Sequence, residues 1–301
     1  MKRYPSCLMS TCVVPWNESG QFEEETFRRC VKSELKGTKH LYLFGTAGEG
    51  YAYTESQFDQ IVDPFLDEMR EGEANPMVGI VHLSLSTIIE RIERCREKGI
   101  KLFQISLPSW GALNDRELFE FFDQVCGRFS DCQFMHYNLP RAKRIVTGKE
   151  YGKLADAHPN LVATKNTGDS TSHIRSLILD APQLQHFLSE SGYIYGSMFG
   201  ECGILVSFVM NWPKQQALLE AGHRQDVATM VAIQSEIDVV VQSLFETLPD
   251  DRIDGAYDKL FAKMYDESFP LRLLPPYQAS TDEEFQAFMV LMKERLPEWV
   301  P

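Results

Sequence analysis

Short apolar segments alternate with amphipathic segments along the first two-thirds of this sequence. The apolar segments have the length and composition of buried strands, and each is followed by residues whose apolar positions recur at helical spacing. Eight such pairs fit into roughly 210 residues with no linker-like stretch between them. The repetition predicts an α/β fold in which eight parallel strands close into a (β/α)8 barrel, the TIM-barrel architecture. The predicted strands are Leu8–Val14, Leu41–Phe44, Met77–Val81, Lys101–Leu107, Gln133–His136, Leu161–Thr164, Gln185–Leu188 and Gly203–Val209.

The main alternative for such a repeat is an open, doubly wound sheet. A sheet of that kind more often stops at five or six strands and carries a glycine-rich dinucleotide-binding loop near its start, which this sequence lacks. Strand patterns end after Pro213, and helical patterns follow it. We therefore predict a barrel domain at residues 1–222 and a C-terminal helical extension at 223–301 packed on the barrel. The helical patterns of the extension are Asp226–Leu244, Asp254–Met264 and Thr281–Arg295, and capping boxes are predicted at Thr54/Gln57, Thr147/Glu150 and Thr281/Glu284.

Composition excludes several kinds of partner. The formal net charge is -13 at pH 7 and the isoelectric point is about 5.1, so no basic excess is available to neutralise nucleic-acid phosphates or anionic lipids. The cysteines number seven, form no CxxC pair, and are best explained as reduced thiols of a cytoplasmic protein. No apolar run approaches the roughly 20 residues of a membrane helix. We therefore expect neither nucleic acid nor a membrane as a partner.

The segment Leu161–Ser170 places a lysine where a buried strand meets a loop. An apolar run ends at Lys165, and small polar and glycine residues follow before helical spacing resumes. A lysine beside a turn is usually a solvated surface residue. In a barrel, however, the carboxyl ends of the strands and the loops after them form the active site. A lysine amine that is desolvated there has a lowered pKa and a larger neutral fraction able to attack a ketone.

Two further segments at predicted strand ends could serve the same chemistry. The sequence Gly45-Thr46-Ala47-Gly48-Glu49-Gly50 follows the second strand. Its three glycines let backbone N–H groups converge on an anion such as a carboxylate, although glycines also serve tight turns. The fifth strand is followed by Tyr137-Asn138-Leu139-Pro140. The Tyr137 hydroxyl could exchange protons with a reacting carbonyl, or the ring could be an aromatic residue of the rim.

A lysine, a tyrosine hydroxyl and an anion-binding loop are the groups that Schiff-base chemistry needs. The iminium formed from a lysine and a ketone is an electron sink, which lowers the barrier to making or breaking the bond between the carbons alpha and beta to it. Their joint occurrence at three strand ends is more specific than any one of them. It predicts a reaction that proceeds through a covalent Schiff base on Lys165, without a metal and without a cofactor.

Three histidines suggest an alternative to Schiff-base chemistry, namely a metal site. His82, His136 and His186 lie near the ends of the third, fifth and seventh predicted strands, positions from which barrel enzymes often assemble metal sites. Neighbours on a strand point to opposite faces, so His136 and Tyr137 cannot both face the barrel interior. The sequence contains neither HxH nor HExxH. A metal-dependent barrel hydrolase is therefore the less favoured alternative, and no metal site is predicted.

At these residues the sequence resembles the dihydrodipicolinate synthase / N-acetylneuraminate lyase family of Schiff-base-forming barrel enzymes. The 45–49 loop resembles that family's G-T/S-T-G-E motif, and Tyr137–Pro140 resembles its Y-N-x-P motif. The run His158-Pro159-Asn160 followed by Lys165 is similar to its h-P-N-i-x-g-x-K motif. The resemblance covers the chain from the first strand to the last helix and includes two later segments, Gly203–Pro213 and Pro270–Pro276.

The resemblance implies a role for each matching residue. Lys165 would form the Schiff base with a 2-oxo acid such as pyruvate, and Tyr137 would move protons to and from the carbinolamine and the substrate oxygen. Thr167 matches a substrate-contacting threonine of the sialic-acid lyase branch. The family also implies a homo-oligomer, either a dimer or a tetramer of dimer pairs. The residues expected to hold the substrate carboxylate are Thr46, Ala47 and Gly48.

Departures from the family pattern bear on the second substrate. Ala47 replaces the second hydroxyl residue of the loop, and Trp110 stands where the synthase branch has a relay tyrosine contributed across a dimer interface. Ala142 stands where an arginine is expected, with Arg141 and Arg144 on either side. These changes disfavour dihydrodipicolinate synthesis.

The acidic pair that grips sugar hydroxyls in the sialic-acid lyases aligns with Ser191 and Gly192, which disfavours that activity too. Trp110 and Phe208 indicate an apolar or aromatic outer pocket, as in the hydratase-aldolase branch that acts on aryl-substituted pyruvates. The substrate-binding residues predicted for this outer part are Trp110, Ser191 and Leu205.

The sequence therefore predicts a class I lyase, aldolase or hydratase-aldolase that acts on a pyruvate-derived 2-oxo acid. The candidate partners are this small molecule, an aldehyde as the second substrate, and further copies of the same chain. A binding protein or sensor with little turnover is an alternative, because two hydroxyl groups of the family's proton relay are missing.

Overall fold

Eight parallel strands form a closed barrel in sequence order, from β1 to β8. The computed structural model describes residues 2–167, 170–206, 211–248 and 252–301. The predicted (β/α)8 barrel is confirmed. Its strands are β1 (Leu8–Thr11), β2 (Leu41–Leu43), β3 (Met77–Ile80), β4 (Leu102–Ile105), β5 (Gln133–Asn138), β6 (Leu161–Asn166), β7 (Gln185–Leu188) and β8 (Gly203–Val206).

Helices alternate with the strands, and four helices follow β8. Side-chain caps begin many of them, and the three predicted capping boxes start α2, α5 and α11. The helices are α1 (Glu24–Glu34), α2 (Glu55–Glu71), α3 (Leu85–Glu97), α4 (Asp115–Phe122), α5 (Gly148–Ala157), α6 (Thr171–Asp180), α7 (Glu190–Ser197), α8 (Trp212–Arg224), α9 (Val227–Thr247), α10 (Asp254–Tyr265) and α11 (Asp282–Arg295), with single turns at Asp123–Gly127, Pro140–Ala142 and Pro297–Trp299.

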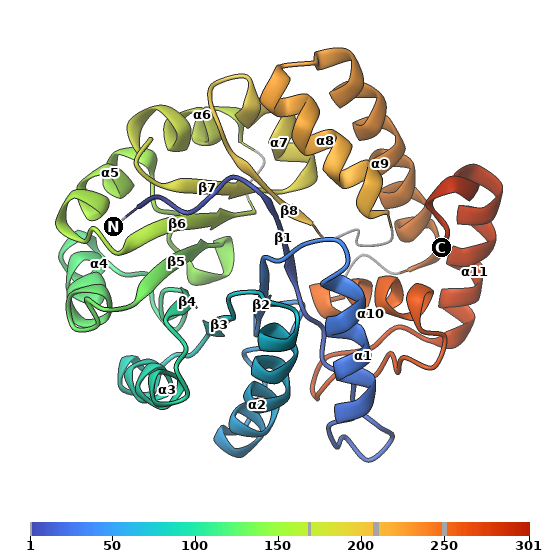
Figure 1. The fold of residues 1–301 in the computed structure, drawn as a ribbon, viewed down its shortest axis with the longest axis horizontal. Helices are drawn as coiled ribbons and strands as arrows, with labels where there is room; N and C mark the ends of the chain where they lie inside the picture. Colours follow the sequence, from blue (N-terminus) through green and yellow to red (C-terminus); the bar gives the residue numbers. More distant parts are fainter. Residues whose placement is uncertain (1, 168–169, 207–210, 249–251) are drawn as a thin grey trace. The chain divides into compact units, whose positions relative to one another are not determined.

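The chain groups into two compact units. In the first unit, β5, β6 and β7 pair in parallel, with one shift of the β5–β6 register between Phe134 and Met135, and α5, α6 and α7 lie on their outer side (Figure 1). In the second unit, β1 pairs with β2, and α1 packs beside α10 (Figure 1). The predicted boundary near residue 222 divides the chain differently and stays a prediction. The first unit is Met1–Met9, Pro76–Leu205 and Leu219–Val227; the second is Ser10–Asn75, Val206–Leu218 and Ala228–Pro301.

β5 and β6 each continue two residues past their predicted ends. Tyr137 pairs with Lys165 and Asn138 pairs with Asn166 in the parallel ladder. The apolar pattern stops earlier because these residues are polar or charged, but all four are buried. The lysine therefore lies within a strand and not in the loop after it.

The four strands β1 to β4 are shorter than predicted. β1 ends at Thr11, three residues before the predicted end at Val14. β8 is described as far as Val206. The remainder of the predicted eighth strand, with Phe208 of the expected outer pocket, lies outside the described residues.

Helix α9 corrects the expectation that no segment approaches the length of a membrane span. The helix is long and apolar enough to cross a membrane, with a mean hydropathy of 1.3. A core helix of a globular protein can have the same length and composition. Near its middle, Glu236 accepts hydrogen bonds from Lys214 Nζ and Trp299 Nε1, each at 2.7 Å. Met230, Ile237 and Val240 are buried on the helix. These contacts are those of a helix packed against protein.

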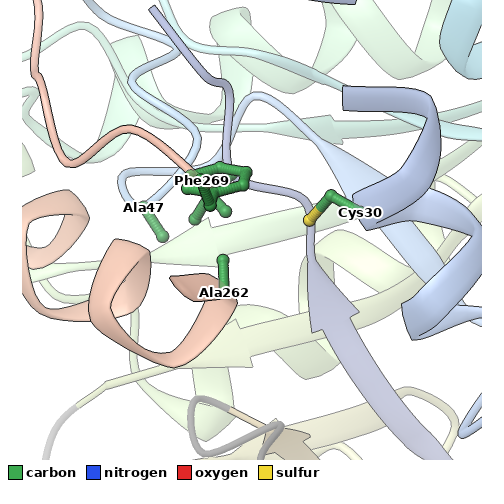
Figure 2. Packing of buried hydrophobic residues seen from close by; sticks show 5 residues of the cluster. Cys30, Ala47, Ala262 and Phe269 are labelled. Atoms are coloured by element: carbon green, nitrogen blue, oxygen red, sulfur yellow. The ribbon is translucent and has the colours of Figure 1, made fainter. Parts of the chain in front are cut away.

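A small apolar cluster joins segments of the second unit that are distant in the sequence. Its members are Val13, Cys30 on α1, Ala47 in the loop after β2, Ala262 on α10 and Phe269. Figure 2 shows the Phe269 ring between Ala47 and Cys30, with Ala262 pointing toward it. The loop that carries Ala47 therefore rests on the C-terminal helix α10.

One turn after Cys30, α1 carries a buried carboxyl group. Glu34 is 6% exposed, and its oxygens accept hydrogen bonds from Ser10 Oγ at 3.0 Å and from Cys30 Sγ at 3.6 Å. Neither partner carries a positive charge. Burial therefore raises the pKa of Glu34 from 4.5 to about 8, although both hydrogen bonds oppose the shift. The side chain is largely protonated at neutral pH.

This raised pKa predicts a stability that falls as the pH rises. The native state retains a proton between about pH 4.5 and pH 8 that the unfolded chain has lost, so unfolding becomes easier through that window. Glu34→Gln imitates the protonated form. We expect it to match wild type at pH 4.5 and to exceed it at pH 8.5 by a few kcal/mol, on the order of the 1.4 kcal/mol per unit of pKa shift.

Urea unfolding at the two pH values measures this difference. Glu68→Gln is the matched control, because Glu68 is also buried but is paired with Arg28 at 2.9 Å and with Lys32 at 3.4 Å. That substitution should destabilise the protein at both pH values. Equal stability of the Glu34 variant and wild type at pH 8.5 would contradict the assignment.

Candidate active site

Lys165 is a buried lysine on β6 with 6% of its surface exposed. It pairs with Tyr137 on β5 and with Phe187 on β7. Its Nζ atom lies 3.9 Å from the centre of the Tyr137 ring, a cation–π distance. Tyr137 itself is 2% exposed. The structure thus brings the two residues predicted to be catalytic into contact, within the first unit.

Both side chains lie on the inner face of the barrel wall. His136, one residue before Tyr137, makes a hydrogen bond of 2.6 Å through Nδ1 to the hydroxyl of Tyr151 on α5. The helices lie outside the strands, so His136 points outward. Because side chains alternate along a strand, Tyr137 points inward, and Lys165 points inward beside it.

A chain of polar side chains runs along the outer face of the same strands. Asn138 accepts a hydrogen bond from the Val146 amide and donates to Val146 O, both at 2.9 Å. It also donates to Asn166 Oδ1 at 3.1 Å, and Asn166 donates to Thr164 Oγ1 at 2.8 Å. Thr164 in turn lies 2.7 Å from His186 Nδ1. Residues before and after Lys165, and the residue after Tyr137, are therefore held by directional bonds.

The histidine at the end of this chain is a neutral acceptor. His186 Nε2 lies 2.9 Å from the carbonyl oxygen of Ala181 and must donate to it, so Nδ1 accepts from the Thr164 hydroxyl. Burial lowers the pKa of His186 to about 4 and that of His136 to about 3. Both rings are uncharged at neutral pH, and their hydrogen bonds lie on the outer face of the barrel wall.

The three histidines of the alternative metal site each have another hydrogen-bond partner in the described part of the chain. His136 is engaged with Tyr151, His186 with Thr164, and His82 Nδ1 accepts from the Ser84 amide at 3.0 Å. No group of three or more His, Cys, Asp or Glu side chains suited to a metal ion occurs among the described residues.

The glycines of the 45–50 loop are required by close packing. A Cβ atom on Gly48 would lie 2.6 Å from the carbonyl oxygen of Cys12, and one on Gly50 would lie 2.2 Å from that of Phe44. The residues with a left-handed backbone conformation in this segment are Phe44, with φ 65°, and Glu49, with φ 54°, and not the glycines. The amides of Glu49 and Gly50 bond to the carbonyls of Thr46 and Gly45 within the loop, each at 3.0 Å. These two amides are therefore engaged within the loop, and an anion-binding role for the amides of Ala47 and Gly48 stays a prediction.

Glu49 fixes this loop to the C-terminal helices. Its Oε1 atom lies 2.6 Å from Lys259 Nζ on α10 and accepts a hydrogen bond of 2.9 Å from Trp16 Nε1. Its Oε2 atom accepts from the Leu274 amide at 2.7 Å. Lys259 also donates to the carbonyl of Arg272. Both charged side chains are fully buried. Burial lowers the pKa of Lys259, and the neighbouring carboxylate counters part of that shift.

The residues predicted for substrate binding have different degrees of exposure. Thr46, Ala47 and Leu205 are 6%, 7% and 6% exposed, and Gly48 is also buried. Thr167 and Ser191 are exposed, and Ser191 lies in the first turn of α7. Trp110 is 85% exposed, and its carbonyl accepts a hydrogen bond from Lys143 Nζ at 2.8 Å. Arg144 is engaged with Asp115 and Glu150, at 2.7 and 2.5 Å. The roles assigned to these residues stay predictions.

Comparison with known protein families covers nearly the whole chain. A model of the dihydrodipicolinate synthetase family matches residues 5–291. The chain belongs to this family. Membership makes it a lyase of the Schiff-base-forming class I aldolase type, and it confirms the resemblance stated from the sequence.

Individual relatives are distant. A 4-hydroxy-tetrahydrodipicolinate synthase of Thermus thermophilus is 27% identical over 205 residues, which is 66% of this chain and 68% of the relative. A dihydrodipicolinic acid synthase family protein from E. coli K12, solved in complex with pyruvate, superposes with a TM-score of 0.85 at 17% identity and covers 96% of this chain and 97% of its own. A sialic acid aldolase of Ruminococcus gnavus, a catalytic lysine mutant, gives 0.83 at 15% identity, covering 98% and 100%. At these identities the solved structures support the fold.

The Glu49–Lys259 pair predicts a strong energetic coupling. Lys259→Met leaves a buried carboxylate without its cation and should destabilise the protein by roughly 3–5 kcal/mol. Glu49→Gln combined with Lys259→Met removes both charges and should recover most of this loss. A double-mutant cycle of urea unfolding measures the coupling. The single Lys259 variant being as stable as wild type would show that the pair does not hold the loop.

Proposed function

We propose that this protein is a class I lyase or aldolase, or a hydratase-aldolase, that forms a Schiff base between Lys165 and a pyruvate-derived 2-oxo acid. The observation that carries the proposal is the buried Lys165 amine, 3.9 Å from the Tyr137 ring on the inner barrel wall. A buried lysine in contact with an aromatic ring has lost most of its hydration, and desolvation favours the neutral, nucleophilic amine.

The proposed reaction begins with the neutral Lys165 amine. The nitrogen attacks the ketone carbon, and a C–N bond forms as the π electrons of the carbonyl move to its oxygen. The nitrogen then gives up one of its protons, which restores its lone pair, and the oxygen takes up a proton to become the carbinolamine hydroxyl. A second proton on that hydroxyl lets it leave as water, and the nitrogen lone pair forms the iminium. The iminium then accepts the electron pair of the bond between the carbons alpha and beta to it as an aldehyde departs, giving an enamine. Protonation of the enamine carbon and attack by water release the product and restore the amine.

Tyr137 is the proposed proton carrier of these steps. Its position beside Lys165 suits transfer to the carbinolamine oxygen and removal of the proton from the hydroxyl on the beta carbon. The iminium of the substrate itself supplies the electron sink, so we propose that the reaction needs neither a metal nor a cofactor, and that a chelator leaves turnover unchanged.

We propose that the 45–49 loop holds the substrate carboxylate, through the Thr46 hydroxyl and the amides of Ala47 and Gly48. Support comes from the rigid anchoring of this loop by Glu49, because a fixed set of donors binds an anion with little loss of entropy. Thr167 is proposed to contact the same substrate.

The second substrate is proposed to be an aldehyde, and the residues assigned to it are Trp110, Ser191 and Leu205. We further propose that the chain works as a dimer or tetramer in the cytoplasm. An 85% exposed tryptophan and seven buried cysteines without a disulfide support these two proposals.

Borohydride trapping tests the Schiff base directly. With pyruvate, wild type should gain the mass of one reduced adduct on Lys165, because reduction converts the iminium into a stable secondary amine. Lys259 is an internal control, since it is also fully buried but is paired with Glu49. Peptide mapping that finds no label on Lys165, or equal labelling of Lys165→Ala, would overturn the proposal. A trapped adduct without turnover on any aldehyde would favour the binding-protein alternative.

Removal of the Tyr137 hydroxyl should separate binding from catalysis. Tyr137→Phe is expected to retain the adduct with pyruvate and to lower kcat by roughly 10²–10⁴-fold, the contribution of a general acid–base. Tyr151→Phe is the matched control: it removes a buried hydroxyl on the outer wall, where it bonds to His136, and should leave kcat within a few fold. Steady-state kinetics measure both, and wild-type turnover of the Tyr137 variant would exclude this role.

A further inference from the structure

A cavity of about 360 Å³ lies within the second unit, where residues of α1 and α10 line it. Cavities of this size accommodate small organic ligands. The residues proposed to act on the 2-oxo acid and the aldehyde are not among the described residues that line it. The cavity is therefore a place where a second kind of ligand could bind.

Much of the cavity wall is apolar. Val13, Cys30, Val206, Ala262 and Phe269 line it, and each is at most 9% exposed. Figure 2 shows Cys30 of α1 and Ala262 of α10 beside the Phe269 ring. Apolar surface of a ligand that enters this space leaves water, which favours binding.

A buried carboxyl group lines the same cavity. Glu34 is 6% exposed, and its hydrogen-bond donors in the described part of the chain are the uncharged Ser10 hydroxyl and Cys30 thiol. Glu49 and Glu68 are buried too, but each forms an ion pair, with Lys259 and with Arg28. Glu34 is thus a buried acid to which the described residues supply no cation.

Basic residues at the cavity are directed to other carboxylates. Arg29 pairs with Asp266 at 2.8 Å, and Lys32 pairs with Glu68 at 3.4 Å. Lys36 also lines the cavity and is exposed to solvent. The counter-charge for the buried carboxyl group would therefore have to come from a ligand.

The residues at the cavity favour a cationic ligand over a neutral or an anionic one. An anion would lie among the carboxyl groups of Glu34, Asp258 and Asp266, all of which line the cavity. A neutral apolar molecule would cover the apolar wall and leave Glu34 without a counter-charge. A protonated amine would form a charge-assisted hydrogen bond with the Glu34 carboxylate, which is stronger than a bond between neutral groups.

We propose that this cavity binds a small organic cation, a protonated amine on an apolar body, with the nitrogen paired to Glu34 and the body against Ala262 and Phe269. The site is additional to the proposed active site and does not depend on Schiff-base chemistry at Lys165.

Binding of the amine should release a proton near neutral pH. Burial raises the pKa of Glu34 to about 8, so the free protein holds a proton there that the ion pair excludes. As the pH rises from 7 to 8.5, less free energy is spent on removing this proton. The affinity for the amine should therefore increase about tenfold over that range.

Other titratable groups near Glu34 keep their protonation state in this range. Burial raises the pKa of the Cys12 and Cys30 thiols well above their usual value, and raises that of Tyr265 to about 12. The charged residues that line the cavity besides Glu34 are Arg29, Lys32, Lys36, Asp258 and Asp266.

Calorimetric titration with 2-phenylethylamine tests the proposal. The uncharged 2-phenylethanol and the anionic 3-phenylpropanoate are comparison ligands of similar shape. At pH 8.5 the amine should bind at least about tenfold more tightly than either, because hydrogen bonds to charged groups are the stronger ones. At pH 7, titrations in two buffers of different ionisation enthalpy should show release of nearly one proton per amine bound.

Glu34→Gln removes the charge and should retain the fold, because it imitates the protonated form. It should weaken amine binding about tenfold or more at pH 8.5 and abolish the proton release. Glu190→Gln is the matched control, since Glu190 is also buried but is not among the residues that line the cavity. Glu190→Gln and Lys165→Ala should both bind the amine as wild type does, and the second separates this site from the proposed active site.

Four results would overturn the inference. The first is the absence of saturable amine binding by wild type, and the second is equal affinity of wild type and Glu34→Gln. The third is binding of the alcohol or the carboxylate as tightly as the amine. The fourth is a crystal structure of the complex in which the amine nitrogen lies beyond hydrogen-bond distance of Glu34. If Glu34→Gln does not fold, the ligand preference and the proton release of wild type decide the question.

Discussion

The parallel register between β5 and β6 is the constraint on which the rest of the site depends. It places Lys165 opposite Tyr137 on the inner wall, and Asn138 opposite Asn166 on the outer wall. A slip of one residue would exchange the faces and turn the lysine toward the helices. The outer chain of hydrogen bonds opposes such a slip, because it ends in backbone groups of Val146 and Ala181 that the helices fix. Hydrogen bonds on the outer face of the wall thus help to hold Lys165 and Tyr137 in position on the inner face.

The two buried lysines show how surroundings decide the use of the same side chain. Lys259 lies between a carboxylate and a backbone carbonyl, which are acceptors that hold an ammonium group in place. Its ion pair ties the loop after β2 to α10 and serves the fold. Lys165 lies over an aromatic face, which stabilises a cation less than a carboxylate does. The proposed function assigns the role of nucleophile to this second lysine.

Much of this could be predicted from the sequence because it depends on periodicity. The eight repeats and the three capping boxes are local patterns that the structure confirms, and the family match confirms the resemblance. The ends of β5 and β6 were predicted two residues early, since an apolar pattern cannot reveal polar residues that are buried by pairing. Alternation along β5 and β6 could have shown that Asn138 and Asn166 share a face.

Other features had no signal in a single sequence. Lys259 follows Glu49 by 210 positions, and no local sequence pattern predicts the ion pair between them. Contacts between distant segments are set by the packing of whole elements, so local propensity does not contain them.

The residues proposed to act on the substrate differ in how firmly the fold holds them. Lys165 and Tyr137 lie on strands, where pairing on both sides and burial fix each position. Trp110, Thr167 and Ser191 follow strand ends and are exposed, so a substitution there disturbs few packed neighbours. A barrel can therefore keep one way of activating a 2-oxo acid while its loops diverge. Departures from the family pattern at Trp110 and Ser191 are then expected to alter the second substrate and to leave the Schiff base intact.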